Sequence, residues 1–225
     1  MRKLIVFLVL LGILLAVLDR VAVAGVEKEV ARQIAARYDL SSPPTVKVEG
    51  IPFLTQAVSG RYEEIRVHIG EMTTSDGAKL SRIDAVLHGV NAPLMDLIQN
   101  SATADVRADK VTGTIVISRE TLDARAPRGL KLHGNGDNSL TVTGNLTVAG
   151  LSVPVSARMK IQIVPGGVRL TPSDVNGVRV PDAAKTLGFT VPIKDLPLNL
   201  RIQSVRTTSE GLVVQGLGRD VPLRA

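Results

Sequence analysis

The chain has 225 residues, a formal net charge of +6 and no cysteine, a length that suits one large domain or two small ones. The absence of cysteine excludes disulfides and thiolate metal sites. The positive charge is dispersed and aromatic residues make up 2% of the chain, which argues against a nucleic-acid-binding protein. A modest basic balance favours contact with anionic surfaces such as phospholipid headgroups.

The N-terminal segment is typical of export. Two basic residues precede an uncharged apolar run of 15 residues, Leu4 to Leu18, which is shorter than the roughly 20 residues that span a bilayer comfortably. Ala22-Val23-Ala24 then fits the pattern cut by signal peptidase. We expect residues 1–24 to be either a cleaved signal peptide or an uncleaved anchor that holds residues 4–18 in the cytoplasmic membrane. In both cases residues 25–225 are exported, because the basic residues stay inside.

An amphipathic helix is predicted from Gly25 to Leu40. Its apolar positions, Val26, Val30 and Ile34, recur every four residues among charged neighbours. The Ser-Ser-Pro-Pro sequence that follows ends it. Such a helix can pack on a sheet as ordinary core or form one wall of a lipid pocket, and the pattern is compatible with both.

The stretch from Gly50 to Ile69 changes its period half-way. A Gly-Ile-Pro sequence stops the preceding strand. Phe53 and Leu54 then begin one short helical turn with an apolar face, which Gly60 ends. From Tyr62 onward apolar and polar residues alternate, as in a strand that is buried on one face. We therefore expect a strand end, an apolar plug and a half-buried strand.

Strands are predicted for most of the remaining chain, joined by short apolar helices at residues 93–99 and 118–122. The clearest alternation runs from Leu140 to Ile163, where two strands meet at a turn at residues 149–150. Pro154 has no N–H for a ladder, so it indicates a sheet edge at that point.

The last part of the chain is less regular. Residues 171–197 contain four prolines and are predicted to be irregular, with a short helix near residues 181–187. A final hairpin turns at residues 209–211. Long strands with one apolar face must pack that face against another element, and helices are predicted to do so here. We therefore expect an α+β fold. In it, a long, strongly curved antiparallel sheet wraps around the N-terminal amphipathic helix and the short apolar helices, in a single elongated domain.

No catalytic, metal or cofactor site is predicted. The three histidines, His68, His88 and His133, are far apart in sequence and lack metal-ligand spacing. Metalloprotease, P-loop and nucleophile-elbow motifs are absent. Aspartates are scattered at expected turns and strand ends, where they favour local hydrogen bonds. The sequence leaves open a pair of carboxylates that meet only in space, as glycosidases require.

The Gly-Ile-Pro-Phe-Leu-Thr-Gln run, followed by Gly-x-Tyr and an alternating strand, resembles the actinobacterial family typified by lipomannan elongation factor A, formerly a domain of unknown function. The resemblance extends from about Asp19 to the C-terminus. It implies a fold like that of the tubular lipid-binding (TULIP) proteins. It also implies an exported, non-enzymatic envelope protein that binds phospholipid or phosphoinositide at the outer face of the cytoplasmic membrane. Such a protein would support elongation of the mannan of lipomannan, with envelope glycosyltransferases as partners.

Two other classes stay open beside this interpretation: an enzyme that acts on envelope glycolipids, and a structural envelope module with a solid core. If the chain binds lipid, apolar faces on the covering helices are the natural place for an acyl chain, since each buried methylene contributes about 0.8 kcal/mol. The residues predicted to line such a pocket are Val26, Val30, Ile34, Phe53 and Leu54. In a solid core the same residues would be close-packed instead.

Overall fold

The computed structural model forms two compact units, each built from separate segments of the chain. The first consists of Met1–Ile69, Asp84–Thr112 and Gly218–Ala225, and the second of Gly70–Ile83 and Gly113–Leu217. The short helices predicted at residues 93–99 and 181–187 lie outside the described residues. The structure describes residues 2–73, 79–92, 105–126, 130–136, 139–148, 151–165, 167–176, 188–192 and 200–223.

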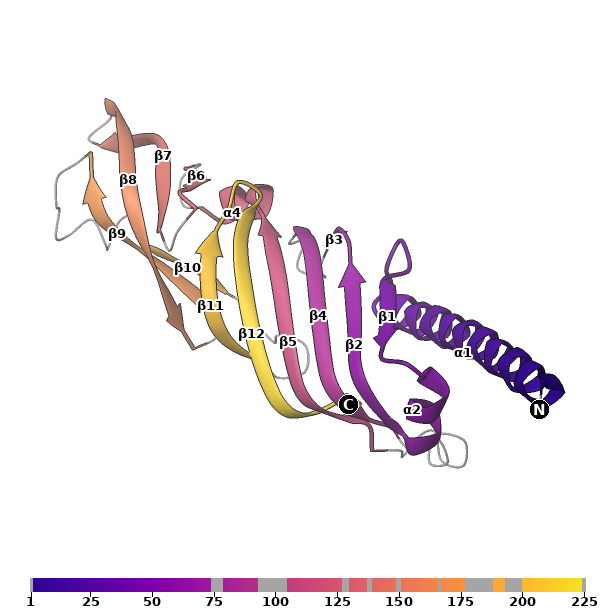
Figure 1. The fold of residues 1–225 in the computed structure, drawn as a ribbon. Coiled ribbons are helices and arrows are strands. Elements are labelled where there is room, and N and C mark those ends of the chain that lie inside the picture. The colour runs from indigo at the N-terminus through magenta and orange to yellow at the C-terminus, as the bar shows by residue number, and fades with distance from the viewer. Residues whose placement is uncertain are drawn as a thin grey trace. The chain divides into compact units, whose positions relative to one another are not determined.

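The first unit begins with one continuous helix, α1 (Figure 1). This helix merges the predicted N-terminal apolar segment with the predicted amphipathic helix. It is long and apolar enough to cross a membrane, and every residue from 2 to 18 is exposed. The elements of this unit are α1 (Arg2–Arg37), β1 (Thr45–Glu49), α2 (Phe53–Ser59) and β2 (Arg61–Ile69), with parts of β4 (Lys79–Asn91), β5 (Arg107–Ser118) and β12 (Gly211–Pro222).

The second unit is built mainly of strands. It holds the remaining parts of β4, β5 and β12. Its other elements are β3 (Met72–Thr73), α4 (Arg119–Arg125), β6 (Lys131–Gly134), β7 (Ser139–Val148), β8 (Leu151–Val164), β9 (Gly167–Val175), β10 (Phe189–Pro192) and β11 (Arg201–Thr207).

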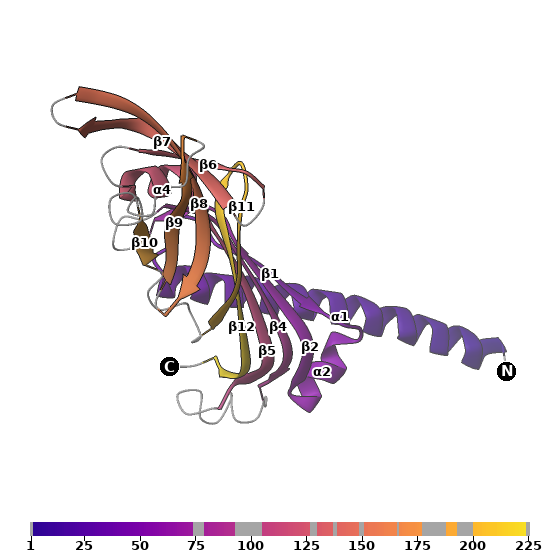
Figure 2. The same cartoon turned by 90° about the vertical axis from the view of Figure 1, so that its left-hand side faces the viewer.

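The strands form two sheets. One has the order β1-β2-β4-β5-β12-β11, with β3 paired to β4, and the other has the order β10-β9-β8-β7-β6. The strands are mostly antiparallel and the first sheet is strongly curled, like part of a barrel (Figure 2), which confirms the α+β, TULIP-like prediction. Helix α1 lies against β1, the edge strand of that sheet, and against α2.

Strand periodicity explains the core of the second unit. In the β7–β8 hairpin, Leu140 pairs with Met159 and Val142 with Ala157. All four are at most 1% exposed, so the alternation predicted from residues 140 to 163 correctly identifies the buried face. The buried face does not extend along the whole of β8, because Val153 near its start is 40% exposed.

The prolines mark edges and register shifts. At Pro154, β8 is paired only with β7, because its pairing with β9 begins at Ala157, so the predicted sheet edge is confirmed. The prediction of an irregular segment at residues 171–197 is wrong in part. Strand β9 continues past Pro172, where the register shifts, and β10 is an edge strand that ends at Pro192. Proline is tolerated at these positions because no ladder hydrogen bond depends on its nitrogen.

The short elements follow local rules. Helix α2 ends at Gly60, which adopts a left-handed conformation with φ of 68°. Helix α4 begins after Ser118, whose hydroxyl accepts a hydrogen bond from the N–H of Thr121 at 3.2 Å. The final hairpin pairs Thr207 with Leu212, as expected.

A matched pair of valines tests this description of the second unit. Val142→Ala should lower the free energy of unfolding by about 2 kcal/mol, because it removes buried methyl groups and leaves a cavity. Val153→Ala should change it by about 0.5 kcal/mol or less, because that side chain is partly in water. Urea denaturation measures both, and equal effects would contradict the assigned face of the hairpin.

Candidate functional site

The candidate site lies where α1 leaves its exposed apolar run and joins the first unit. From this point every fourth residue of the helix, Asp19, Val23, Glu27 and Ala31, faces α2 or β1 or is buried. We call these four residues the junction stripe. It combines two apolar side chains with two carboxylates, and each carboxylate binds a backbone N–H of another element.

Asp19 of α1 caps the start of α2, which is 35 residues away in sequence. Its Oδ1 accepts a hydrogen bond from the N–H of Leu54 at 2.8 Å, and its carboxylate pairs with the guanidinium of Arg20. The residue at the cap position of α2, Pro52, provides no side-chain hydrogen bond. Because the first N–H groups of a helix lack partners within it, Asp19 serves as the missing cap. Its side chain is only 6% exposed.

Val23 anchors a small apolar cluster. It is buried with Val48 of β1 and Phe53 of α2, and Tyr62 packs against this cluster. The ring centroids of Phe53 and Tyr62 are 6.1 Å apart, a distance typical of aromatic pairs. Burial raises the pKa of the Tyr62 phenol, so this side chain stays neutral beside the cluster at neutral pH.

Glu27 covers the edge of the sheet. Its Oε1 accepts a hydrogen bond from the N–H of Val48 at 2.9 Å, and its Oε2 lies 3.2 Å from the Nζ atom of Lys47. Strand β1 is the last strand on this side, so that N–H points away from its own sheet. Unpaired N–H and C=O groups on an edge strand can pair with a strand of another chain. Here Glu27 of α1 already binds one of these N–H groups, that of Val48.

The Gly-Ile-Pro-Phe-Leu-Thr-Gln run is a structural corner. Gln56 is buried, and its amide donates to the carbonyl of Glu49 at 3.1 Å and accepts from the N–H of Glu63 at 2.8 Å. Gly50 has φ of +99°, and a Cβ there would lie 2.5 Å from the Nε2 atom of Gln56. The run therefore needs glycine and glutamine together, and both hold the end of β1 to the start of β2.

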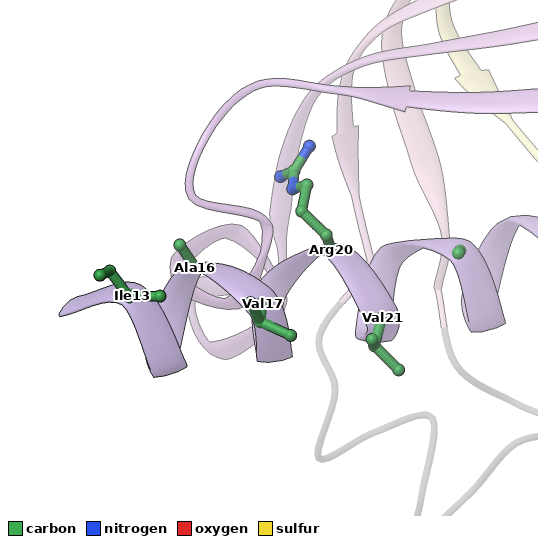
Figure 3. Close-up of a pocket in the computed structure, with 6 residues that line it drawn as sticks. Ile13, Ala16, Val17, Arg20 and Val21 are labelled. Atoms are coloured by element: carbon green, nitrogen blue, oxygen red, sulfur yellow. The ribbon is translucent and has the colours of Figure 1, made fainter. Parts of the chain in front are cut away.

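An open hollow of about 590 Å³ lies along a neighbouring face of α1 (Figure 3). The described residues that line the hollow are three or four positions apart, as on one face of a helix. One of them, Arg20, is charged. All of its described lining residues belong to α1, so it is an open apolar surface and not an enclosed pocket. The described residues that line it are Ile13, Ala16, Val17, Arg20, Val21 and Ala24.

The predicted pocket residues fall into three environments. Val30 and Ile34 are half-buried on α1, whereas Val26 is 39% exposed. On α2, Phe53 is 3% exposed inside the apolar cluster and Leu54 is 37% exposed. None of the five is among the described residues that line the hollow. Their role in lipid binding stays a prediction.

Sequence reasoning missed the junction stripe because it divided the chain at Ala24. That division placed Asp19 and Val23 in a leader and Glu27 on a solvent face. A signal was available, since the spacing of four residues continues unbroken across the division. The backbone partners of the two carboxylates are 35 and 21 residues away, and no local pattern reveals them.

Two histidines lie beside carboxylates that are distant in sequence, and both side chains are solvent-exposed, as predicted for histidines on strands. His68 Nδ1 lies 2.6 Å from Asp84 Oδ1, and His88 Nδ1 lies 3.1 Å from Glu64 Oε2. The side chains of both histidines are more than 40% exposed. Among the described residues, no three histidine, aspartate or glutamate side chains gather as a metal site would require.

Comparison with known families decides the classification. The model of the LmeA-like phospholipid-binding family matches residues 17–216. The chain belongs to this family. The match begins two residues before Asp19, so the shared LmeA-like region includes the junction stripe and not only the domain expected after residue 24. Neither the curated proteins nor the solved structures gave a match.

The capping role of Asp19 can be tested on stability. Asp19→Ala should lower the melting temperature by a few degrees, because it leaves the first N–H groups of α2 without a partner. Asp19→Asn should be milder, because the amide oxygen can still accept the hydrogen bond of Leu54. Differential scanning calorimetry in detergent measures both. Glu29→Ala, which removes an exposed carboxylate from the same helix, is the control and should have no effect.

Proposed function

We propose that this chain is an exported envelope protein that binds phospholipid or phosphoinositide at the outer face of the cytoplasmic membrane. In this proposal it has no catalytic activity and supports elongation of lipomannan, with envelope glycosyltransferases as partners. Family membership supports the lipid ligand. The chemistry of the described residues fits a binding protein, because they provide apolar surface and structural hydrogen bonds.

The observation that carries the proposal is the continuity of α1. Its first 17 described residues, 2–18, are exposed and almost all apolar, and such a surface is costly in water. The same helix then enters the folded unit through buried Asp19 and Val23. Cleavage after Ala24 would remove both side chains from the unit. We therefore favour an uncleaved anchor over a signal peptide.

Lipid binding of this kind needs apolar shelter more than polar recognition. Burying a methylene contributes about 0.8 kcal/mol, so about ten sheltered methylenes favour binding by several kcal/mol after ordering costs. In this proposal the pocket combines half-buried and exposed apolar side chains of α1 and α2 with the buried ring of Phe53. The proposed acyl-chain contacts are Val26, Val30, Ile34, Phe53 and Leu54.

A structural module is the second candidate, and the packing of the second unit favours it there. A cavity in its described part has a volume of about 10 Å³, which is room for about one water molecule. It is lined by residues of α4, β6, β7 and the β11–β12 hairpin. In this proposal the first unit holds the lipid, because α1 and α2 offer exposed and half-buried apolar side chains there, and the second unit has a supporting role.

Lipid carriage is tested by native mass spectrometry of the protein purified from its own membrane. We expect phospholipid to remain bound to the wild-type protein. Leu54→Asp should stay folded, because that side chain is 37% exposed and its charge can be hydrated. It should retain several-fold less lipid and transfer less lipid between liposomes.

Thr55→Asp adds the same charge to an exposed neighbour on α2 and is the matched control, with lipid binding unchanged. An unfolded Leu54→Asp protein would show that Leu54 is ordinary core. A folded variant with undiminished lipid would remove Leu54 from the pocket. Wild-type protein without lipid would contradict the proposed function itself.

A further inference from the structure

The uncharged apolar run of α1 is shorter than the hydrocarbon core of a membrane, although the whole helix is long enough to cross it. Leu4 to Leu18 are 15 residues, which in a helix extend for about 22 Å, whereas the hydrocarbon core is about 30 Å thick. A short span is accommodated when the bilayer thins or when neighbouring apolar surface is drawn into it. If α1 is the membrane anchor that we propose, a neighbouring apolar surface of the first unit is expected to contact the bilayer.

The segment around α2 carries unusual apolar exposure. Ile51 and Val58 are 83% and 82% exposed, and Leu54 between them is 37% exposed. We call these three residues the α2 patch. The opposite side of α2 is the one that packs, through Phe53 and Gln56. The patch therefore stays exposed, because α2 makes its contacts in the described part of the first unit through its other side.

The Asp19 cap fixes the level of this patch. Leu54 is hydrogen-bonded at 2.8 Å to Asp19, the residue that directly follows the apolar run. Val58 lies one turn further along α2, or about 6 Å. The interfacial layer on each side of the hydrocarbon core is about 5–8 Å thick. Whatever the direction of α2, Leu54 and Val58 therefore lie within about one interfacial thickness of the level of Asp19 when α1 spans the bilayer.

We propose that the α2 patch is a membrane-contacting surface that inserts into the outer interface of the bilayer beside α1. The bilayer is the occupant that the structure favours, because Leu54 of the patch is hydrogen-bonded to Asp19, the residue that directly follows the exposed apolar run. The Asp19 carboxylate between them is paired with Arg20 and with the α2 backbone, so it meets no lipid unpaired. Arg20 is half exposed there and can reach lipid phosphates.

The absence of cysteine makes a direct test possible. Single variants Ile51→Cys, Val58→Cys, Leu11→Cys and Val153→Cys of the full chain are labelled with a nitrobenzoxadiazole fluorophore. They are reconstituted in vesicles of phosphatidylcholine and phosphatidylglycerol. A phosphatidylcholine with a nitroxide near the top of its acyl chain is the quencher for the labels at Ile51, Val58 and Val153, and one with a nitroxide near the end of its acyl chain is the quencher for the label at Leu11. Labels at Ile51 and Val58 should be quenched several-fold more than the label at Val153, which is also exposed but belongs to the second unit.

The label at Leu11 separates this inference from the proposed function. Quenching at Leu11 without quenching at Val58 overturns the membrane contact and leaves the anchor intact. A blue-shifted but unquenched label at Val58 indicates contact with protein, including a second copy of the chain, and also overturns it. Equal quenching at Val153 shows that the patch is not special. No quenching at Leu11 overturns the anchor and this inference with it.

Discussion

The first unit depends on two hydrogen bonds that α1 makes to the backbone of other elements. A helix start and a sheet edge both leave N–H groups without partners. Asp19 satisfies one at the start of α2 and Glu27 satisfies one on β1, with Val23 buried between them. Since these three side chains lie one turn apart on a single helix, α1 cannot tilt away without losing all of them. The exposed apolar run is therefore joined to the fold without an intervening linker.

The corner at Gly50 shows how a family motif can be structural and still matter for function. Gln56 holds the end of β1 to the start of β2, and Gly50 leaves the space that the glutamine amide occupies. This corner sets where α2 projects, and α2 carries two of the residues proposed to touch acyl chains and, with Ile51 just before it, the exposed apolar patch. A phospholipid-binding protein of this kind needs no catalytic motif, because apolar burial supplies the binding free energy.

The fold was largely predictable from periodicity, and the site was not. A strand that buries one face has an apolar residue at every second position of its sequence. For this reason β8, its partner β7 and the last hairpin were predicted correctly. Long-range contacts leave no such trace. The partners of Asp19 and Glu27 are more than 20 residues away, and the helix that carries them crosses the predicted cleavage site. The prolines near β9 and β10 misled the prediction because edges and register shifts tolerate them.

The central claim is that one helix serves both as the membrane anchor and as a packed element of the fold. The most direct measurement is the intact mass of the protein extracted from its own membrane. We expect a species that retains residues 1–24, close to the 23.9 kDa of the whole chain. A folded, lipid-binding protein that begins at Gly25 would contradict the claim, because it would lack Asp19 and Val23 and yet keep α2 in place.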